Sequence, residues 1–297
     1  MRRIAVLAVA AVVVALSGCG SQDASGGKPA VVASTDVWGS VIAAVGGDYV
    51  DVTSIINSPQ QDPHSFEASP GDAAAIADAN LVVYNGGDYD HWVDDVLASH
   101  PGVSAIDAYS LRADTEQPAN EHVFYDVGTA KAVAAAIGDR LADIEPGHAD
   151  DYRSNAIEFG KQADAILESE RAIGRAHPSA SVVATEPVAY YLLRNAGIAD
   201  RTPPGFASAV EEGDDPSPAD VAAMFDLIDS QQVSALLFNP QTETAATKQI
   251  VDAARRVGMP VVTVTETLPE GTDYLTWQRQ TVEQLAGQLN KAPQANR

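Results

Sequence analysis

The sequence predicts an α/β protein with two lobes, each built on a mainly parallel sheet flanked by helices, and with one long helix that links them. Short runs of apolar, β-branched residues alternate with helical patterns along the chain, which is typical of parallel strands covered by helices on both faces. One uninterrupted helical pattern divides this alternation into two halves. About 278 residues follow the expected signal peptide, which is long for one hydrophobic core and enough for two lobes.

The N-terminus has the features of a bacterial secretory signal. Two arginines precede an apolar run over residues 4–16, and small residues lead into Cys19. The run is about 13 residues, whereas a transmembrane helix needs roughly 20. The small residues before Cys19 resemble a lipobox, which implies cleavage before this cysteine and attachment of lipid to its sulfur; an ordinary signal peptide with a chance cysteine is the alternative. We expect a signal peptide over residues 1–18 and a lipid-anchored linker over residues 19–29, outside the cytoplasmic membrane.

Charge and cysteine content exclude several functional classes. The formal net charge of −23 argues against nucleic acid as a partner, since nothing in the chain could neutralise a run of phosphates. An acidic surface favours solubility and attracts cations. Cys19 is the only cysteine, so the mature body has no disulfide, no cysteine-based zinc site and no thiol nucleophile.

The first lobe is expected over residues 30–145. Ser69 is suited to cap a helix, and Pro70 follows it at the first helical position, where its missing N–H is not needed. A polar loop over residues 112–121 precedes His122. The pattern predicts strands at 30–33, 49–56, 81–84 and 103–106, and helices that begin after Asp36, at Pro70, near Trp92 and near Gly128.

The long linking helix is expected over residues 146–177. Apolar residues recur there at spacings of four and three, with Glu170 as the one polar member of the stripe. No proline or capping glycine interrupts the pattern before Gly174 and Pro178. A helix of about 28 residues is roughly 40 Å long, so we interpret it as a rigid spine between the lobes. An ordinary surface helix or a coiled coil is the alternative.

The second lobe repeats the alternation over residues 178–290 and leaves a tail over residues 291–297. The pattern predicts strands at 181–184, 235–238 and 261–264, and helices at 188–196, 219–230, through 253–257 and at 274–289. Trp38 and Trp277, one in each lobe, are expected to be packing residues.

Two histidines and two glutamates lie in loops where this class of fold binds ligands. His64 stands in a turn stiffened by Pro63, and His122 follows the polar loop of the same lobe. Glu186 and Glu266 come one or two residues after buried-type strands of the second lobe, and the carboxyl ends of parallel strands form ligand sites. Two imidazoles and two carboxylates suit a divalent metal ion if the fold gathers them.

The motifs occur in a characteristic order: Asp-Pro-His-Ser-Phe-Glu at 62–67, Ala-Asn-Leu-Val-Val-Tyr-Asn-Gly at 79–86, His122, the long helix, and Asp-Pro-Ser-Pro at 215–218. In this order the chain resembles the metal-binding solute-binding lipoproteins of ABC transporters, the zinc and manganese class, over roughly residues 30–289. The resemblance implies a metal in the cleft between two α/β lobes, with His64, His122, Glu186 and Glu266 as its ligands. It also implies a monomer that delivers the metal to a permease in the cytoplasmic membrane, without enzymatic turnover.

Several positions depart from the pattern of that family. Glu186 stands where zinc members usually have His and manganese members Glu, and Glu266 stands where Asp is usual. Asn120-Glu121 replaces the common Asp-Pro before the second histidine, and Asn239 replaces a common Glu. Two carboxylates with two imidazoles favour Mn²⁺ as the cargo, ahead of Zn²⁺ and then Fe²⁺, although Zn²⁺ binds most such sites more tightly than Mn²⁺.

Three further residues are candidates to support the ligands. Asp36 and Asp62 lie near the expected cleft, where carboxylates commonly orient ligating imidazoles. His91 stands in a loop at a strand end and is a third candidate. A metal-dependent hydrolase that uses the same four ligands is an alternative function, but the sequence lacks His-Glu-x-x-His and Gly-x-Ser-x-Gly patterns. A surface adhesin is a third possibility, which lipidation and acidity allow without indicating it.

Overall fold

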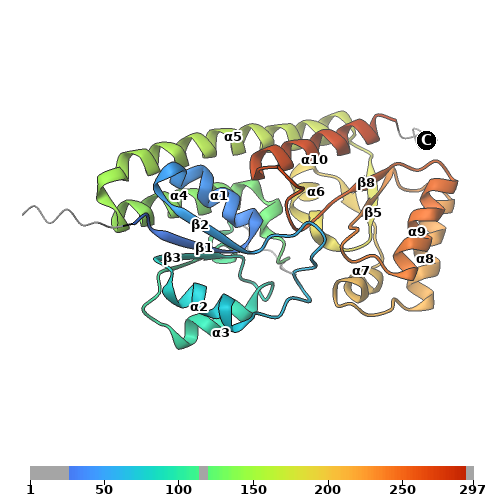
Figure 1. Ribbon diagram of the computed structural model, residues 1–297. Helices are drawn as coiled ribbons and strands as arrows, with labels where there is room; N and C mark the ends of the chain where they lie inside the picture. The colour runs from blue at the N-terminus through green and yellow to red at the C-terminus, as the bar shows by residue number, and fades with distance from the viewer. Residues whose placement is uncertain (1–26, 114–119, 292–297) are drawn as a thin grey trace, which may run out of the picture.

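The computed structural model describes residues 27–113 and 120–291, so the expected signal peptide, the lipidation at Cys19 and residues 292–297 of the expected tail lie outside the described residues. Two parallel four-stranded sheets, each flanked by helices, form two lobes, and one long helix lies along both (Figure 1). The predicted fold class is confirmed. The exact limits of the lobes stay a prediction.

The first sheet has the strand order β2-β1-β3-β4, and all its pairs are parallel. The two central strands are buried on both faces, which explains the continuous apolar runs over residues 31–33 and 81–84. The strands are β1 (Ala30–Thr35), β2 (Asp51–Ile56), β3 (Leu81–Tyr84) and β4 (Ala105–Asp107); the helices are α1 (Asp36–Gly46), α2 (Pro70–Asp78), α3 (His91–Ser99) and α4 (Val127–Ile144). Short 3₁₀ helices lie at Gly47–Tyr49, Tyr109–Leu111 and Val123–Tyr125.

Local signals explain most of these boundaries. The Ser69 hydroxyl accepts a hydrogen bond from Asp72 N, and the Asp72 carboxylate accepts one from Ser69 N, so a capping box starts α2 where the sequence predicts it. The strand expected from residue 49 begins instead at Asp51. The reason is that Gly47, with a φ of 54°, ends α1 and turns the chain into a 3₁₀ helix before the strand can start.

The second sheet has the order β6-β5-β7-β8 and is also fully parallel. Its strands are β5 (Ser181–Ala184), β6 (Ala199–Asp200), β7 (Ala235–Phe238) and β8 (Val261–Thr263); the helices are α6 (Tyr190–Ala196), α7 (Pro204–Glu211), α8 (Pro218–Asp229), α9 (Ala245–Arg256) and α10 (Tyr274–Leu289), with a 3₁₀ helix at Pro187–Ala189. The sequence did not predict β6 or α7. The strand is two exposed residues long, and the helix has only eight residues with a Pro-Gly start, so neither shows a clear periodicity.

The long linking helix is α5 (Ala149–Ala176), of 28 residues, which follows a 3₁₀ helix at Pro146–His148. Its buried stripe is the one expected from the sequence, Glu170 included. It packs on α1 and α4 of the first lobe and on α6 of the second, and α10 runs beside it (Figure 1). One hydrophobic cluster therefore extends from the first sheet through α5 into the second lobe. Among the described helices, none is both long and apolar enough to cross a membrane.

Gly174 lies where α5 crosses the end of α6. A Cβ atom at this position would overlap the backbone carbonyl oxygen of Ala196, which cannot rotate away. We expect Gly174→Ala to lower the free energy of unfolding by about 1–3 kcal/mol, the usual cost of overpacking, in urea denaturation. The matched control is Gly287→Ala in α10, where a Cβ meets nothing within 4 Å, and a gain of about 0.5–1 kcal/mol is expected there. Equal stability of the two variants would contradict this account of the crossing.

Candidate metal site

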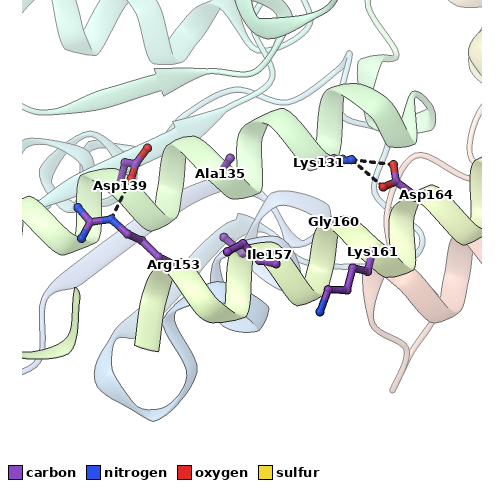
Figure 2. A pocket seen from close by; sticks show the side chains of 9 residues that line it. Lys131, Ala135, Asp139, Arg153, Ile157, Gly160, Lys161 and Asp164 are labelled. Carbon is purple, nitrogen blue, oxygen red and sulfur yellow. Dashed lines mark hydrogen bonds and ion pairs between the residues drawn. The ribbon is translucent and has the colours of Figure 1, made fainter. Parts of the chain in front are cut away.

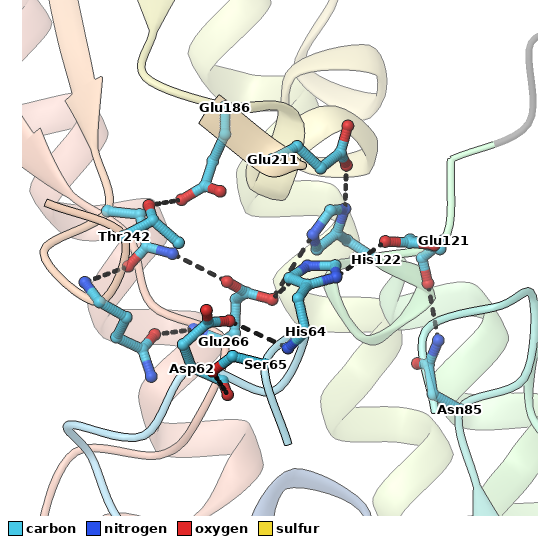
Figure 3. Close-up of polar contacts among 12 residues, drawn as sticks. Asp62, His64, Ser65, Asn85, Glu121, His122, Glu186, Glu211, Thr242 and Glu266 are labelled. Carbon is cyan, nitrogen blue, oxygen red and sulfur yellow. Dashed lines mark hydrogen bonds and ion pairs between the residues drawn. The ribbon is translucent and has the colours of Figure 1, made fainter. Parts of the chain in front are cut away.

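The four predicted ligands approach the space between the lobes from four segments (Figure 3). His64 lies in the loop between β2 and α2, and His122 directly precedes the 3₁₀ helix that leads into α4. Glu186 follows β5 and Glu266 follows β8. Each lobe thus contributes two side chains from loops between its elements, as expected for parallel sheets.

The two imidazoles converge on one carboxylate oxygen of Glu266. His64 Nε2 lies 3.2 Å from Glu266 Oε2, and His122 Nε2 lies 3.6 Å from the same atom. One donor atom from each of the three residues lies within 4.8 Å of the other two. Donor atoms bound about 2.1 Å from one tetrahedral ion are about 3.4 Å apart. The spacing therefore suits a single metal ion.

Glu186 stands beside this group but is not one of its members. Its Oε1 accepts a hydrogen bond of 2.5 Å from Thr242 Oγ1, which fixes the carboxylate near Glu266. Burial, followed by the negative charge of Glu266, raises the pKa of Glu186 to about 7. A cation between the two carboxylates would remove the repulsion that contributes to this shift.

All four predicted ligands share one feature. Each has a buried atom without a hydrogen bond of good geometry: His64 Nε2, His122 Nε2, Glu186 Oε2 and Glu266 Oε2. The two imidazole nitrogens face Glu266 Oε2 as ion pairs of 3.2 and 3.6 Å, whereas Glu186 Oε2 has no partner among the described residues. A buried polar atom without a hydrogen bond costs about 1–3 kcal/mol, and the ion pairs offset this cost only for the three atoms that face one another. Nitrogen and carboxylate oxygen are also the donor types that Mn²⁺ and Zn²⁺ accept. The residues present therefore fit a divalent metal.

The electrostatics of the group follow from its burial and its mixed charges. Burial lowers the pKa of His64, but pairing with Glu266 and the charges of Glu121 and Asp62 outweigh this effect and raise it to about 9. The pKa of His122 is also raised, because Glu266 outweighs burial. Burial alone would raise the pKa of Glu266, yet its pairing with the imidazoles of His122 and His64 holds it well below its usual range. A metal that binds these nitrogens must therefore displace protons.

Neighbouring side chains hold the predicted ligands in place. Asn239 Nδ2 donates to Glu266 Oε1 at 2.9 Å, which leaves Oε2 directed at the imidazoles. His122 donates from its backbone N and, with Nδ1 protonated, from its ring to Asn120 Oδ1, at 2.9 and 3.2 Å. The ring of His64 places Nδ1 3.4 Å from Glu121 Oε1. Each ligand is thus oriented through an atom that faces away from the point of convergence.

The three predicted supporting residues have different roles from the one expected. Asp62 accepts a hydrogen bond from the backbone N of His64 at 2.9 Å and so shapes its loop, without contacting the ring through a hydrogen bond. Asp36 accepts from Leu268 N at 3.1 and 3.2 Å, which holds the loop that follows Glu266. His91 is exposed at the start of α3 and borders a separate surface pocket with Phe66 and Trp92. The structure gives no support to His91 as part of the site.

Tyr89 is an aromatic residue that lies near both imidazoles. Its buried ring lies 5.1 Å from the ring of His64 and 5.8 Å from that of His122, between centroids. Asp88 has a φ of 70° and follows two glycines of positive φ, so the chain turns sharply and directs Tyr89 inward. The sequence indicates His91 in this loop by its residue type, whereas the turn that directs Tyr89 inward leaves no pattern in the sequence.

The sequence did not indicate several other side chains that lie beside the predicted ligands. Glu211 lies at the end of α7, and its Oε1 is 3.9 Å from His122 Nδ1. Glu121 and Asn120 stood out only as departures from the family pattern. Gln241 and Thr242 follow β7. Their position at the end of a strand could have identified them as residues of the site. A cavity of about 810 Å³ borders the group and is lined by His64, Asn120, Glu121 and Glu211 among others, which provides an approach for an ion.

A second cavity, of about 430 Å³, lies between α4 and α5 and has a different character (Figure 2). Ion pairs of 2.7 Å between Lys131 and Asp164 and of 3.2 Å between Arg153 and Asp139 lie at its edges. It contains no histidine, and its lining residues belong to the two helices. It takes no part in the group of predicted ligands.

Comparisons with known proteins agree on one family. The model of the family "Zinc-uptake complex component A periplasmic" (ZnuA) matches residues 31–288. The manganese-binding lipoprotein MntA of Bacillus subtilis is 26% identical over 276 residues, which cover 88% of each chain. The manganese ABC transporter substrate-binding lipoprotein PsaA of Streptococcus mitis is 21% identical over 311 residues, covering 96% of this chain and 97% of PsaA. The solved structure of the periplasmic zinc binding protein TroA from Treponema pallidum has a TM-score of 0.75 at 18% identity, over 89% of this chain and 99% of TroA, which confirms the fold.

Proposed function

This chain belongs to the zinc-uptake complex component A family, and on that premise we propose that it captures a divalent transition metal outside the cytoplasmic membrane and delivers it to an ABC permease for import. Its relatives are metal-binding lipoproteins of ABC transporters. The proposal rests on the buried donor atoms of His64, His122, Glu186 and Glu266, which come from both lobes, and on the three of them that lie within 4.8 Å of one another. The metal is the cargo, and lipidated Cys19 is the proposed anchor.

We propose Mn²⁺ as the cargo, ahead of Zn²⁺ and then Fe²⁺. Two carboxylates beside two imidazoles make a harder donor set than three imidazoles, which suits Mn²⁺. The relatives MntA and PsaA, both named for manganese, support this order. Zn²⁺ remains the stronger competitor in affinity, so a preference for Mn²⁺ in the cell also depends on which ion is available.

Capture is favoured over catalysis by the burial of the group. His122, Glu186 and Glu266 are each at most 1% exposed, and the only partly exposed member is His64. A hydrolase needs an open coordination position with room for water and substrate. The family is a solute-binding component of a transporter, which agrees with the absence of turnover expected from the sequence.

Metal titration of the chain from Gly20 onward tests the proposal. The protein is stripped with a chelator, and its melting temperature is followed as Mn²⁺ or Zn²⁺ is added. We expect one-to-one stabilisation that saturates as metal is added, because a ligand that binds only the folded state raises the free energy of unfolding. The increase is about 2.7 kcal/mol at a ligand concentration 100 times the Kd. Competition between the two ions then ranks them. If neither ion raises the melting temperature, capture is refuted; metal-dependent hydrolysis of ester or phosphate reporters would favour the hydrolase instead.

A further inference from the structure

Two carboxamide side chains, Asn120 and Gln241, occupy equivalent places in the space between the lobes. Each uses its amide oxygen to hold a proposed ligand of its own lobe and its amide nitrogen to reach the backbone of the other lobe. The two side chains come from opposite lobes. Together they connect all four ligand-bearing segments.

Asn120 joins the segments of His122 and Glu186. Its Oδ1 accepts the two hydrogen bonds from His122, and its Nδ2 donates to Pro187 O at 3.1 Å. Pro187 is the residue directly after Glu186. The backbone oxygen of Asn120 also accepts a hydrogen bond of 2.7 Å from the hydroxyl of Tyr191 in α6. Two bonds therefore cross from this one residue to the second lobe.

Gln241 joins the segments of Glu266 and His64. Its Oε1 accepts from Glu266 N at 2.6 Å, and its Nε2 donates to Gln61 O at 2.8 Å, three residues before His64. The same Nε2 donates to Thr267 Oγ1 at 2.8 Å. Thr267 Oγ1 in turn donates to Ser58 O at 3.3 Å in the first lobe. The loop of His64 is thus attached to the loop of Glu266 through one amide.

We propose that Asn120 and Gln241 are positioning residues that act as cross-lobe latches, so that metal release requires the hydrogen bonds between these two residues and the opposite lobe to break. This inference rests on the proposed function of metal capture. Each amide contacts a ligand through oxygen and the opposite lobe through nitrogen, so closure of the lobes and placement of the ligands occur together. A hydrogen bond contributes about 0.5–1.5 kcal/mol, and its loss is expected to speed release about 2- to 10-fold.

The variants Asn120→Asp and Gln241→Glu separate the two roles of each amide. Both keep the oxygen that accepts from the ligand segment and lose the nitrogen that donates across the lobes. We expect Mn²⁺ to dissociate about 2- to 10-fold faster from each, measured by stopped-flow mixing with excess chelator at pH 8, with an association rate that does not fall. An added carboxylate near a cation would by itself slow release, so a charge effect predicts the opposite sign.

Tyr191→Phe provides an uncharged second test. It removes the hydroxyl that donates to Asn120 O and leaves both His122 contacts to Asn120 in place. Faster Mn²⁺ release is expected here too. The absorption spectrum of bound Co²⁺ should match the wild type in all three variants, because the donor atoms are unchanged. If these residues acted only in folding, the variants would change the melting temperature of the metal-free protein and would not release the metal selectively faster.

Matched controls use the same chemical changes within one lobe. Asn57 Nδ2 donates to Ser54 O in the first lobe, and Gln231 Nε2 donates to Val257 O in the second. We expect Asn57→Asp and Gln231→Glu to release Mn²⁺ at the wild-type rate. If the wild type binds metal but the three latch variants release it no faster than these controls, the latch inference is overturned while capture stands. If the wild type binds no metal, the proposed function itself fails.

Discussion

Replacing His122 by alanine is expected to lower the affinity for Mn²⁺ by more than about 100-fold, since even residues that only support a metal ligand contribute about 10- to 100-fold. The imidazole is fully buried, its Nε2 faces Glu266 Oε2 at 3.6 Å, and its removal leaves this carboxylate with one imidazole contact in place of two. The rise in melting temperature on addition of metal should disappear with the affinity. Isothermal titration of the stripped protein measures the loss directly.

The control for this variant is His91→Ala. His91 is the same residue type in the same lobe, but it is exposed on α3 and outside the group of proposed ligands. We expect wild-type affinity and wild-type stabilisation by metal. Because alanine at position 122 also creates a cavity, Glu186→Gln is measured alongside: it keeps the volume of the side chain and should weaken binding through the loss of charge. Tight binding by both His122→Ala and Glu186→Gln would refute the proposed ligand set.

The elements that sequence reasoning predicted well are those that carry a long or continuous signal. The stripe of α5 extends from Tyr152 to Ile173, about six turns, and strands β3 and β7 are apolar at every position, so these elements were visible in the sequence. Their loop positions and the family resemblance led us to expect His64, His122 and Glu266 in one cleft, and one donor atom of each lies within 4.8 Å of the other two. That they bind a metal stays a prediction. Short elements such as β6 and α7 give no comparable signal, and Glu211 was missed with the helix that presents it.

Supporting residues were the hardest to predict, because their roles depend on contacts between distant parts of the chain. Gln241 and Gln61 are 180 positions apart, and the contact exists only when two lobes are placed against each other. Asn120 and Asn239 appeared in the sequence as departures from a family pattern, without an indication of what they contact. His91 was selected over Tyr89 because a histidine signals chemistry, whereas the direction of a side chain depends on a positive φ at Asp88. Residue type was therefore a better guide to the ligands than to their neighbours.

A second large effect is expected away from the metal site, at Glu170 of α5. This carboxylate is fully buried in the apolar stripe, and only its Oε2 has a hydrogen bond, from Asn195 Nδ2 at 3.0 Å. Burial raises its pKa from 4.5 to about 8, and the nearby charge of Asp126 adds to this shift. Between these two pH values the folded protein binds a proton that the unfolded chain releases. The stability that this proton provides is complete below pH 4.5 and is lost as the pH rises through 8.

Glu170→Gln removes this dependence, because the amide is neutral at every pH and its oxygen can still accept from Asn195. We expect the variant to match the wild type in free energy of unfolding near pH 4.5 and to exceed it by about 2–4 kcal/mol at pH 9. This gain is slightly less than the full difference between the folded and unfolded pKa of Glu170 would give. Urea denaturation from pH 4.5 to 9 measures the difference, and the titration of the imidazoles cancels because it is common to both proteins. Glu168→Gln is the control: this exposed carboxylate on the same helix pairs with Arg175 at 2.7 Å, and its loss should cost less than about 1 kcal/mol at any pH. If the gain in free energy of unfolding from Glu170→Gln stays constant with pH, the Glu170 carboxyl does not carry the proton in the folded protein. The buried contact of α5 with α6 would then have to be explained by a charged Glu170.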